Sequence, residues 1–290
     1  MDEDVRRGLS EGEVAGTRYR LTAMRQTPAG RVGMHLGHRV GNSIEFMDYR
    51  EYKPGDDLRR VDWSVYARSD RLTVKLYREE VSPHLDLLVD ASRSMAVTAS
   101  PKARASAALA AALSTAAGNA KFTHALYQAG DRVTPVQGGA GRPGGWQGLD
   151  FAGREGLDAA LRQSPPAWRR RGTRVVISDL LFETKPLPVV QQLGRDAAGL
   201  CIVQLLGQCD VTPPARGNLR LVDSETGQVR EIYIDAAAEK RYLQKLQNHH
   251  DAWYSACRQV GATLVQLIAE PLLASWDLSP LVEAGVLQVK

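Results

Sequence analysis

The feature that most constrains the fold of this 290-residue chain is an alternation of short apolar runs with segments of helical character. Leu85–Val89 and Thr173–Ile177 are mostly apolar, as is typical of parallel strands buried on both faces. Lys102–Ala117 is rich in alanine and predicts a helix. Strands that alternate with helices form an open, mostly parallel sheet with helices on both faces. We therefore expect a doubly wound α/β domain over residues 83–290.

The remaining elements of this domain follow from the same patterns. Glycine, proline and aspartate clusters separate them, because these residues favour turns. We expect helices over 156–163, 186–197 and 236–260, strands over 122–128, 132–137, 200–206 and 263–268, and a hairpin that pairs 219–222 with 229–234.

A charged and aromatic block, residues 31–82, separates this domain from a polar lead-in over residues 1–30, in which we expect at most one short helix. From Glu45 to Glu80 the block holds nine acids and eight bases, and a strand is predicted over 71–81. Matched charges interleaved with rings indicate a small β-rich appendage with internal ion pairs. Arg59 with Asp56 or Asp57, and Asp62 with Arg68, are the expected pairs. The block either braces the appendage or forms a docking surface, and a mixed role is favoured.

Polar residues follow the two most apolar strands. Asp90, Ser92 and Ser94 form a D-x-S-x-S motif after the first strand, and Asp179 follows the second. In open α/β sheets, ligands bind at the carboxyl ends of the strands. A compact set of carboxylate and hydroxyl oxygens suits Mg²⁺ or Mn²⁺. The other interpretation is that Ser92 and Ser94 cap the following helix while Asp90 accepts backbone N–H bonds. The context after a buried strand favours the cation site.

The D-x-S-x-S motif resembles the metal-ion-dependent adhesion site of von Willebrand factor type A domains. The preceding block, together with the hairpin segment 221–227, resembles the bacterial family called domain of unknown function fifty-eight, and the likeness runs from about Gly30 to the C-terminus. The resemblance rests on Gly41, Glu45, Phe46, Arg50, Tyr52, 54–57, Arg59, 61–63, Ala67, Arg68, Leu72, Val74, Lys75, Glu79 and Glu80.

The resemblance implies a fold, a site and a partner. It implies a type A, Rossmann-like domain in which Ser92 and Ser94 bind the cation directly, while Asp90 and Asp179 act through water. A carboxylate of a bound protein then completes the coordination shell. Members of the family are associated with MoxR-type AAA+ ATPases as adaptors or chaperone partners. One departure from the pattern concerns a threonine that type A sites usually add, because residues 135–172 contain none. The occupancy of the site therefore stays open.

Other functions are weighed against this one. The expected role is non-enzymatic, but a metal-dependent phosphohydrolase that uses Asp90 and a structural interaction domain with a vestigial site remain alternatives. The chain has no P-loop motif, so a partner would hydrolyse any ATP. Arg169–Arg171 beside Trp168 could contact nucleic acid, but such a run is more often a solvated loop before a strand, and a net charge of +4 alone does not indicate nucleic-acid binding. No signal peptide or membrane segment is recognisable, and a cytoplasmic location is expected.

Overall fold

The protein divides into two compact units in a computed structural model, which describes residues 2–24, 46–54, 56–77, 83–213, 215–224 and 227–290. The larger unit combines residues 1–29 with residues 83–290, and the smaller unit spans residues 30–82. Gly41, Glu45, Gly55, Glu79 and Glu80 of the family-like pattern lie outside the described residues, as do Glu225 and Thr226 of the hairpin.

A six-stranded, mostly parallel sheet forms the centre of the larger unit, with strand order β11-β8-β7-β4-β5-β6. Its strands are β4 (His84–Asp90), β5 (Thr123–Ala129), β6 (Val133–Pro135), β7 (Thr173–Ser178), β8 (Gly199–Leu206) and β11 (Thr263–Ile268). Every neighbouring pair is parallel except β5 with β6. All residues of β7 and β8 are buried, as their apolar sequences predict.

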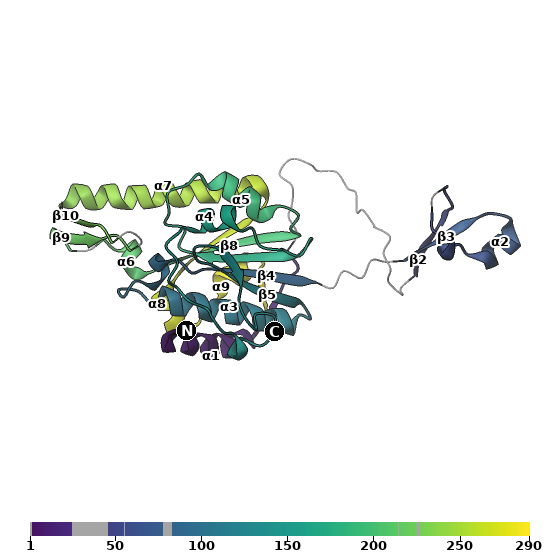
Figure 1. The fold of residues 1–290 in the computed structure, drawn as a ribbon, viewed down its shortest axis with the longest axis horizontal. Coiled ribbons are helices and arrows are strands. Elements are labelled where there is room, and N and C mark those ends of the chain that lie inside the picture. Colours follow the sequence, from purple (N-terminus) through teal and green to yellow (C-terminus); the bar gives the residue numbers. More distant parts are fainter. Residues whose placement is uncertain (1, 25–45, 55, 78–82, 214, 225–226) are drawn as a thin grey trace. The chain divides into compact units, whose positions relative to one another are not determined.

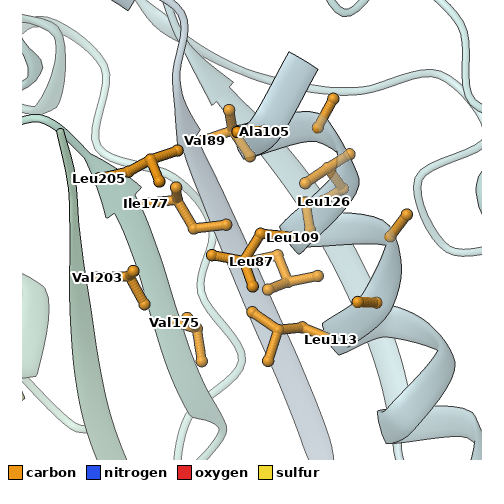
Figure 2. Packing of buried hydrophobic residues seen from close by; sticks show 14 of the residues in the cluster. Leu87, Val89, Ala105, Leu109, Leu113, Leu126, Val175, Ile177, Val203 and Leu205 are labelled. Carbon is orange, nitrogen blue, oxygen red and sulfur yellow. The ribbon is translucent and has the colours of Figure 1, made fainter. Parts of the chain in front are cut away.

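Helices cover both faces of this sheet (Figure 1), as the alternating pattern predicts. One face packs against α3 (Lys102–Asn119), α8 (Ala269–Ser275) and α9 (Ser279–Glu283), and the other against α4 (Leu157–Gln163), α5 (Pro186–Gly194) and α7 (Ala236–Val260). Figure 2 shows the first face, where side chains of β4, β7 and β8 meet Ala105, Leu109 and Leu113 of α3. Two buried apolar layers therefore hold the sheet and fix the positions of its strand ends.

Residues 2–24 pack with the larger unit instead of forming a separate polar lead-in. Helix α1 (Glu3–Gly16) packs on α3, with Val5 and Leu9 in the same apolar cluster as the sheet. Strand β1 (Tyr19–Leu21) pairs with β12 (Leu287–Val289) at the other end of the chain. These residues therefore belong to the larger unit. Composition obscured this packing, because the face of α1 against α3 is made largely of glycine.

The predicted hairpin consists of β9 (Gly217–Val222) and β10 (Val229–Ile234), and it forms a separate two-stranded sheet. The short helix α6 (Gln208–Val211) precedes it, and the Tyr242 hydroxyl of α7 donates a 2.6 Å hydrogen bond to the Asp210 carbonyl. The described residues also form short 3-10 turns, η2 (Arg93–Ala96) and η3 (Pro143–Gly145) in the larger unit and η1 (Leu58–Arg60) in the smaller unit. Within the described ranges, no helix combines the length and apolar character needed to cross a membrane.

The smaller unit contains an antiparallel pair, β2 (Phe46–Glu51) with β3 (Thr73–Tyr77), and helix α2 (Trp63–Ser69) between them. The sequence pattern predicted β3 within 71–81 but missed α2. That helix begins because the Asp62 carboxylate accepts backbone hydrogen bonds from Ser64 and Val65. Asp70 ends it in the left-handed conformation.

Ion pairs in the smaller unit differ from those expected. Asp56 pairs with Arg50 at 2.8 Å, and Asp62 pairs with Lys75 at 3.1 Å. Asp57 accepts a hydrogen bond from the backbone N–H of Arg59, and Arg68 donates to the Ser64 carbonyl. The predicted pairs Arg59 with Asp56 or Asp57, and Asp62 with Arg68, are therefore wrong. The error was to match charges that are close in sequence, whereas Asp62 pairs across the unit to β3.

Candidate functional site

The two strand ends singled out from the sequence lie beside each other. Strand β4 ends at Asp90, β7 ends at Ser178 immediately before Asp179, and the two strands are parallel neighbours. From β4 the chain continues to β5 on one side, whereas β7, β8 and β11 extend the sheet on the other side. The order of the strands thus reverses between β4 and β7. Such a switch point leaves a crevice at the carboxyl ends of the strands, where ligands bind in open α/β sheets.

Asp90 is buried and fully hydrogen-bonded at this edge. One carboxylate oxygen accepts the backbone N–H of Ser92 at 3.0 Å, and the other accepts the Ser178 hydroxyl at 2.5 Å. Burial, reinforced by the negative charge of Asp179, raises the pKa of Asp90 to about 6. In the described part of the chain, no basic side chain forms an ion pair with Asp90. The site therefore carries negative charge that its own residues do not neutralise.

Ser92 and Ser94 lie on the turn that follows β4. Their hydroxyl oxygens are 3.0 Å apart, Ser92 is buried, and Ser94 is partly exposed. Neither caps α3, which begins ten residues after Ser92, and the Ser92 side chain makes no capping bond to the 3-10 turn η2. The capping interpretation of the serines is therefore wrong, although Asp90 does accept a backbone N–H bond. Both hydroxyls therefore lie beside the end of β4, hydrogen-bonded to each other.

A buried lysine is the member of this site that the sequence patterns missed. The Lys102 ammonium lies 2.8 Å from Asp179 and 3.0 Å from Asp210, and its side chain is 2% exposed. Burial lowers the pKa of Lys102, but the carboxylates of Asp179 and Asp210 outweigh that effect and raise it overall. Lys102 is the first residue of α3, an unfavourable place for a cation in the helix dipole. A lysine at the first position of a predicted helix is therefore the sequence feature that could have pointed to Lys102 as part of the site.

The loop after β7 is held in an uncommon conformation. Leu180 has φ of 59°, and its N–H donates to the Ser178 hydroxyl while the N–H of Leu181 donates to Asp179. From the neighbouring strand β8, the Gln204 amide donates to the Asp179 carbonyl at 3.4 Å. A non-glycine residue with positive φ costs free energy, and these hydrogen bonds help to stabilise the loop in that conformation. Of them, the Leu181 N–H holds the Asp179 side chain.

The oxygen atoms of this site suit a hard divalent cation in chemistry and spacing. Mg²⁺ binds oxygen ligands at about 2.1 Å, so adjacent ligands at right angles are about 3.0 Å apart. The hydroxyl oxygens of Ser92 and Ser94 are 3.0 Å apart and are joined by a hydrogen bond. The Lys102 ammonium contacts the carboxylates of Asp179 and Asp210, and the charge of Asp179 also acts on Asp90. Asp90, Ser92, Ser94 and Asp179 are thus the side chains that could hold a divalent cation here.

Two features limit the strength of such a site. Among the described residues, no cluster of three or more His, Cys, Asp or Glu side chains is arranged to hold a metal. The segment that runs beside Ser92 contributes Gly153, whose N–H and carbonyl bond to Ala91 and Arg93. Glycine supplies no side-chain oxygen at the position next to the serines. A bound cation would therefore keep several water molecules, which Mg²⁺ tolerates.

The aromatic and basic residues before β7 serve the fold. Trp168 packs edge-to-face on Tyr127 with ring centroids 5.4 Å apart, and the Arg174 guanidinium lies 4.9 Å from the Trp168 ring centre. Arg174 covers one face of the Trp168 ring, which a nucleobase would need for stacking. The Arg169 N–H donates to the buried Asp86 carboxylate, which anchors the loop. This packing favours the solvated-loop interpretation of Arg169–Arg171.

The charged block of the smaller unit combines internal bonding with exposed surface. Arg50, Asp56, Asp57, Asp62 and Arg68 all bond within the unit. Trp63 is 58% exposed and packs edge-to-face against Tyr66. An exposed tryptophan beside a tyrosine is typical of interaction surfaces.

Comparison with known proteins identifies relatives of the chain. An uncharacterized protein of Mycobacterium bovis and one of Mycobacterium tuberculosis are each 32% identical to it over 256 residues, which is 81% of this chain and 78% of each relative. A solved structure of BatB from Bacteroides thetaiotaomicron covers 70% of this chain and 98% of its own, with 11% identity and a TM-score of 0.34. An aerotolerance-related membrane protein of Bacteroides fragilis covers 61% and 98%, with 13% identity and a TM-score of 0.32.

A family model matches most of the chain and shows which protein family it belongs to. Its match spans residues 48–252, which includes part of the charged block, both strand ends and most of α7. The match therefore joins the smaller unit to the candidate site in one family pattern. The chain belongs to the family described as protein of unknown function DUF58.

Proposed function

We propose that the chain is a non-enzymatic, cytoplasmic protein-binding module that uses a divalent cation, Mg²⁺ or Mn²⁺, and works with a MoxR-type AAA+ ATPase. The observation that carries the proposal is the excess of carboxylates over basic groups at the β4–β7 switch point, beside two hydroxyls 3.0 Å apart. The type A, Rossmann-like character of the domain belongs to the same proposal, as does the ATPase, which the family resemblance implies.

Each residue of the site has a part in this function. Ser92 and Ser94 would bind the cation directly, and Asp90 and Asp179 would hold its water molecules and balance its charge. Ser178 orients Asp90 through its 2.5 Å hydrogen bond, and Gln204 holds the loop that carries Asp179. When bound, the cation supplies an open coordination position for a carboxylate of the partner protein. The protein residues thus determine where an acidic side chain of the partner would attach.

Exposed apolar side chains support a role in protein binding. On the β9–β10 hairpin, Val222 is 61% exposed and Tyr233 is 68% exposed, and Leu221, Val229 and Ile232 are also exposed. Val222 and Val229 face each other across the two strands, and exposed apolar side chains of this kind are available to a partner.

Titration of Mg²⁺ or Mn²⁺ into the chelator-treated protein tests the cation site. We expect a binding signal that Asp90→Asn abolishes, because the substitution removes one carboxylate charge and preserves the shape of the side chain. Asp251→Asn is the matched control, since Asp251 is an exposed residue of α7 whose carboxylate accepts a hydrogen bond from Gln247 of the same helix. Equal binding by the wild type and Asp90→Asn would contradict the site.

A pull-down of a purified MoxR-type ATPase by the tagged chain tests the partner. We expect capture in Mg²⁺ that falls at least tenfold in chelator and in Asp90→Asn. Capture that is the same in all three samples would leave the ATPase as a partner but remove the cation from the mechanism. Absence of capture under every condition would remove the ATPase from the proposal.

A further inference from the structure

The pairing of Lys102 has a consequence for the cation site. Its ammonium contacts the carboxylate oxygen Oδ2 of Asp179 at 2.8 Å, and the other oxygen of that carboxylate accepts the Leu181 N–H. A divalent cation held by Asp179 would therefore lie close to the positive charge of Lys102. Like charges a few ångströms apart repel strongly in a buried site, where water screens them little.

Lys102 also has an alternative partner, which allows it to release Asp179. Asp210 lies 3.0 Å from the same ammonium, on α6 and outside the predicted cation-binding set. The Asp210 carboxylate is held in place by the backbone N–H of Gly207 at 2.8 Å. A buried ammonium without a partner would be strongly unfavourable. With Asp210 in place, Lys102 keeps one ion pair when Asp179 turns to a cation.

We propose that Lys102 is a built-in cation of the site that competes with the divalent ion for Asp179, and that Asp210 accepts Lys102 when the ion binds. This inference rests on the proposed function, and it assigns Lys102 and Asp210 as the residues that set the affinity of the site. In the absence of the ion, Lys102 holds the strand-end loop through Asp179. When the ion binds, the ammonium remains paired with α6, the helix that leads into the β9–β10 hairpin.

The position of Lys102 supports this competition. It is the first residue of α3, where the helix dipole disfavours a positive charge, so the two carboxylates alone retain it. Its helix is otherwise buried mainly through alanine and leucine against the sheet, which fixes the backbone from which the lysine extends. The ammonium is thus held near Asp179 by the fold and does not diffuse away when an ion competes.

Divalent-ion titration of charge variants tests the proposal. Lys102→Gln keeps a hydrogen-bond donor of similar reach but removes the charge, and we expect it to bind Mg²⁺ at least tenfold more tightly than the wild type. Lys102→Arg keeps the charge, and its affinity is expected to stay within threefold of the wild type or to fall. Asp210→Asn removes the alternative partner, and its affinity is expected to fall at least threefold. Arg104→Gln is the matched control, because Arg104 is on the same helix and pairs with Glu11 away from the site.

The results separate this inference from the proposed function. If the wild type binds Mg²⁺ and Lys102→Gln binds it equally or more weakly, Lys102 is not a competitor and the function stands. If only Lys102→Gln binds, the competition stands and the wild-type chain works without a divalent ion. If none of the variants binds, both are overturned. Thermal unfolding with Mg²⁺ and with chelator gives a second readout, since ligand binding raises the midpoint even for a destabilised variant.

Discussion

Gly12→Ala is expected to destabilise the larger unit by about 2–3 kcal/mol, although it adds a single methyl group. Gly8, Gly12 and Gly16 form one stripe on α1, and this stripe lies on α3. A Cβ atom at Gly12 would lie 1.9 Å from the Ala108 carbonyl oxygen, far inside van der Waals contact. Since the obstacle is backbone, the two helices must separate to admit the methyl group.

Gly118→Ala is the matched control for this prediction. Gly118 is an exposed residue near the end of α3, and no atom lies within 4 Å of the position of its missing Cβ. Alanine is a better helix former than glycine, so this variant should be neutral or more stable by up to about 1 kcal/mol. Urea unfolding followed by circular dichroism measures both variants. Equal stability of Gly12→Ala and the wild type would show that α1 is not packed on α3 in this way.

The sheet and most of its helices could be predicted, because burial on both faces leaves a strong pattern in the sequence. Helix α7 and strand β11 have the expected bounds, 236–260 and 263–268. Short elements whose stability comes from distant partners left no such pattern. Strand β12 forms only by pairing with β1 near the other terminus, and α2 depends on the cap supplied by Asp62.

Some residues of the candidate site could likewise be predicted from the sequence, and others could not. Asp90, Ser92 and Ser94 are adjacent in sequence, and Asp179 follows the other strongly apolar strand, so the rule for open sheets could bring them together. Lys102 and Asp210 could not be found by that rule, because their pairing depends on how α3 and α6 approach the strand ends. Charges far apart in sequence give no signal of their contact, whereas those near in sequence misled the pairing of Asp62.

Asp90→Asn is expected to make the protein more stable while it abolishes cation binding. Burial and the charge of Asp179 raise the pKa of Asp90 from 3.8 to about 6 in the folded protein. The folded state therefore holds this proton more tightly than the unfolded chain. Between about pH 4 and pH 6, that difference makes stability fall as the pH rises, and above about pH 6 the full cost of the ionised carboxylate is present.

Asparagine has no charge to bury, so the gain should appear only where Asp90 is ionised. At pH 7.5 in chelator, we expect Asp90→Asn to exceed the wild type by up to about 3 kcal/mol in free energy of unfolding. The gain should shrink as the pH falls from 6 toward 4. Saturating Mg²⁺ should stabilise the wild type but not Asp90→Asn, and so reduce the difference between their free energies of unfolding. Urea titrations at pH 5, 6 and 7.5 measure this, with Asp251→Asn as the control. If Asp90→Asn is less stable than the wild type at pH 7.5, the ionised Asp90 carboxylate stabilises the fold. Its charge is then already compensated by the protein, which contradicts the cation site.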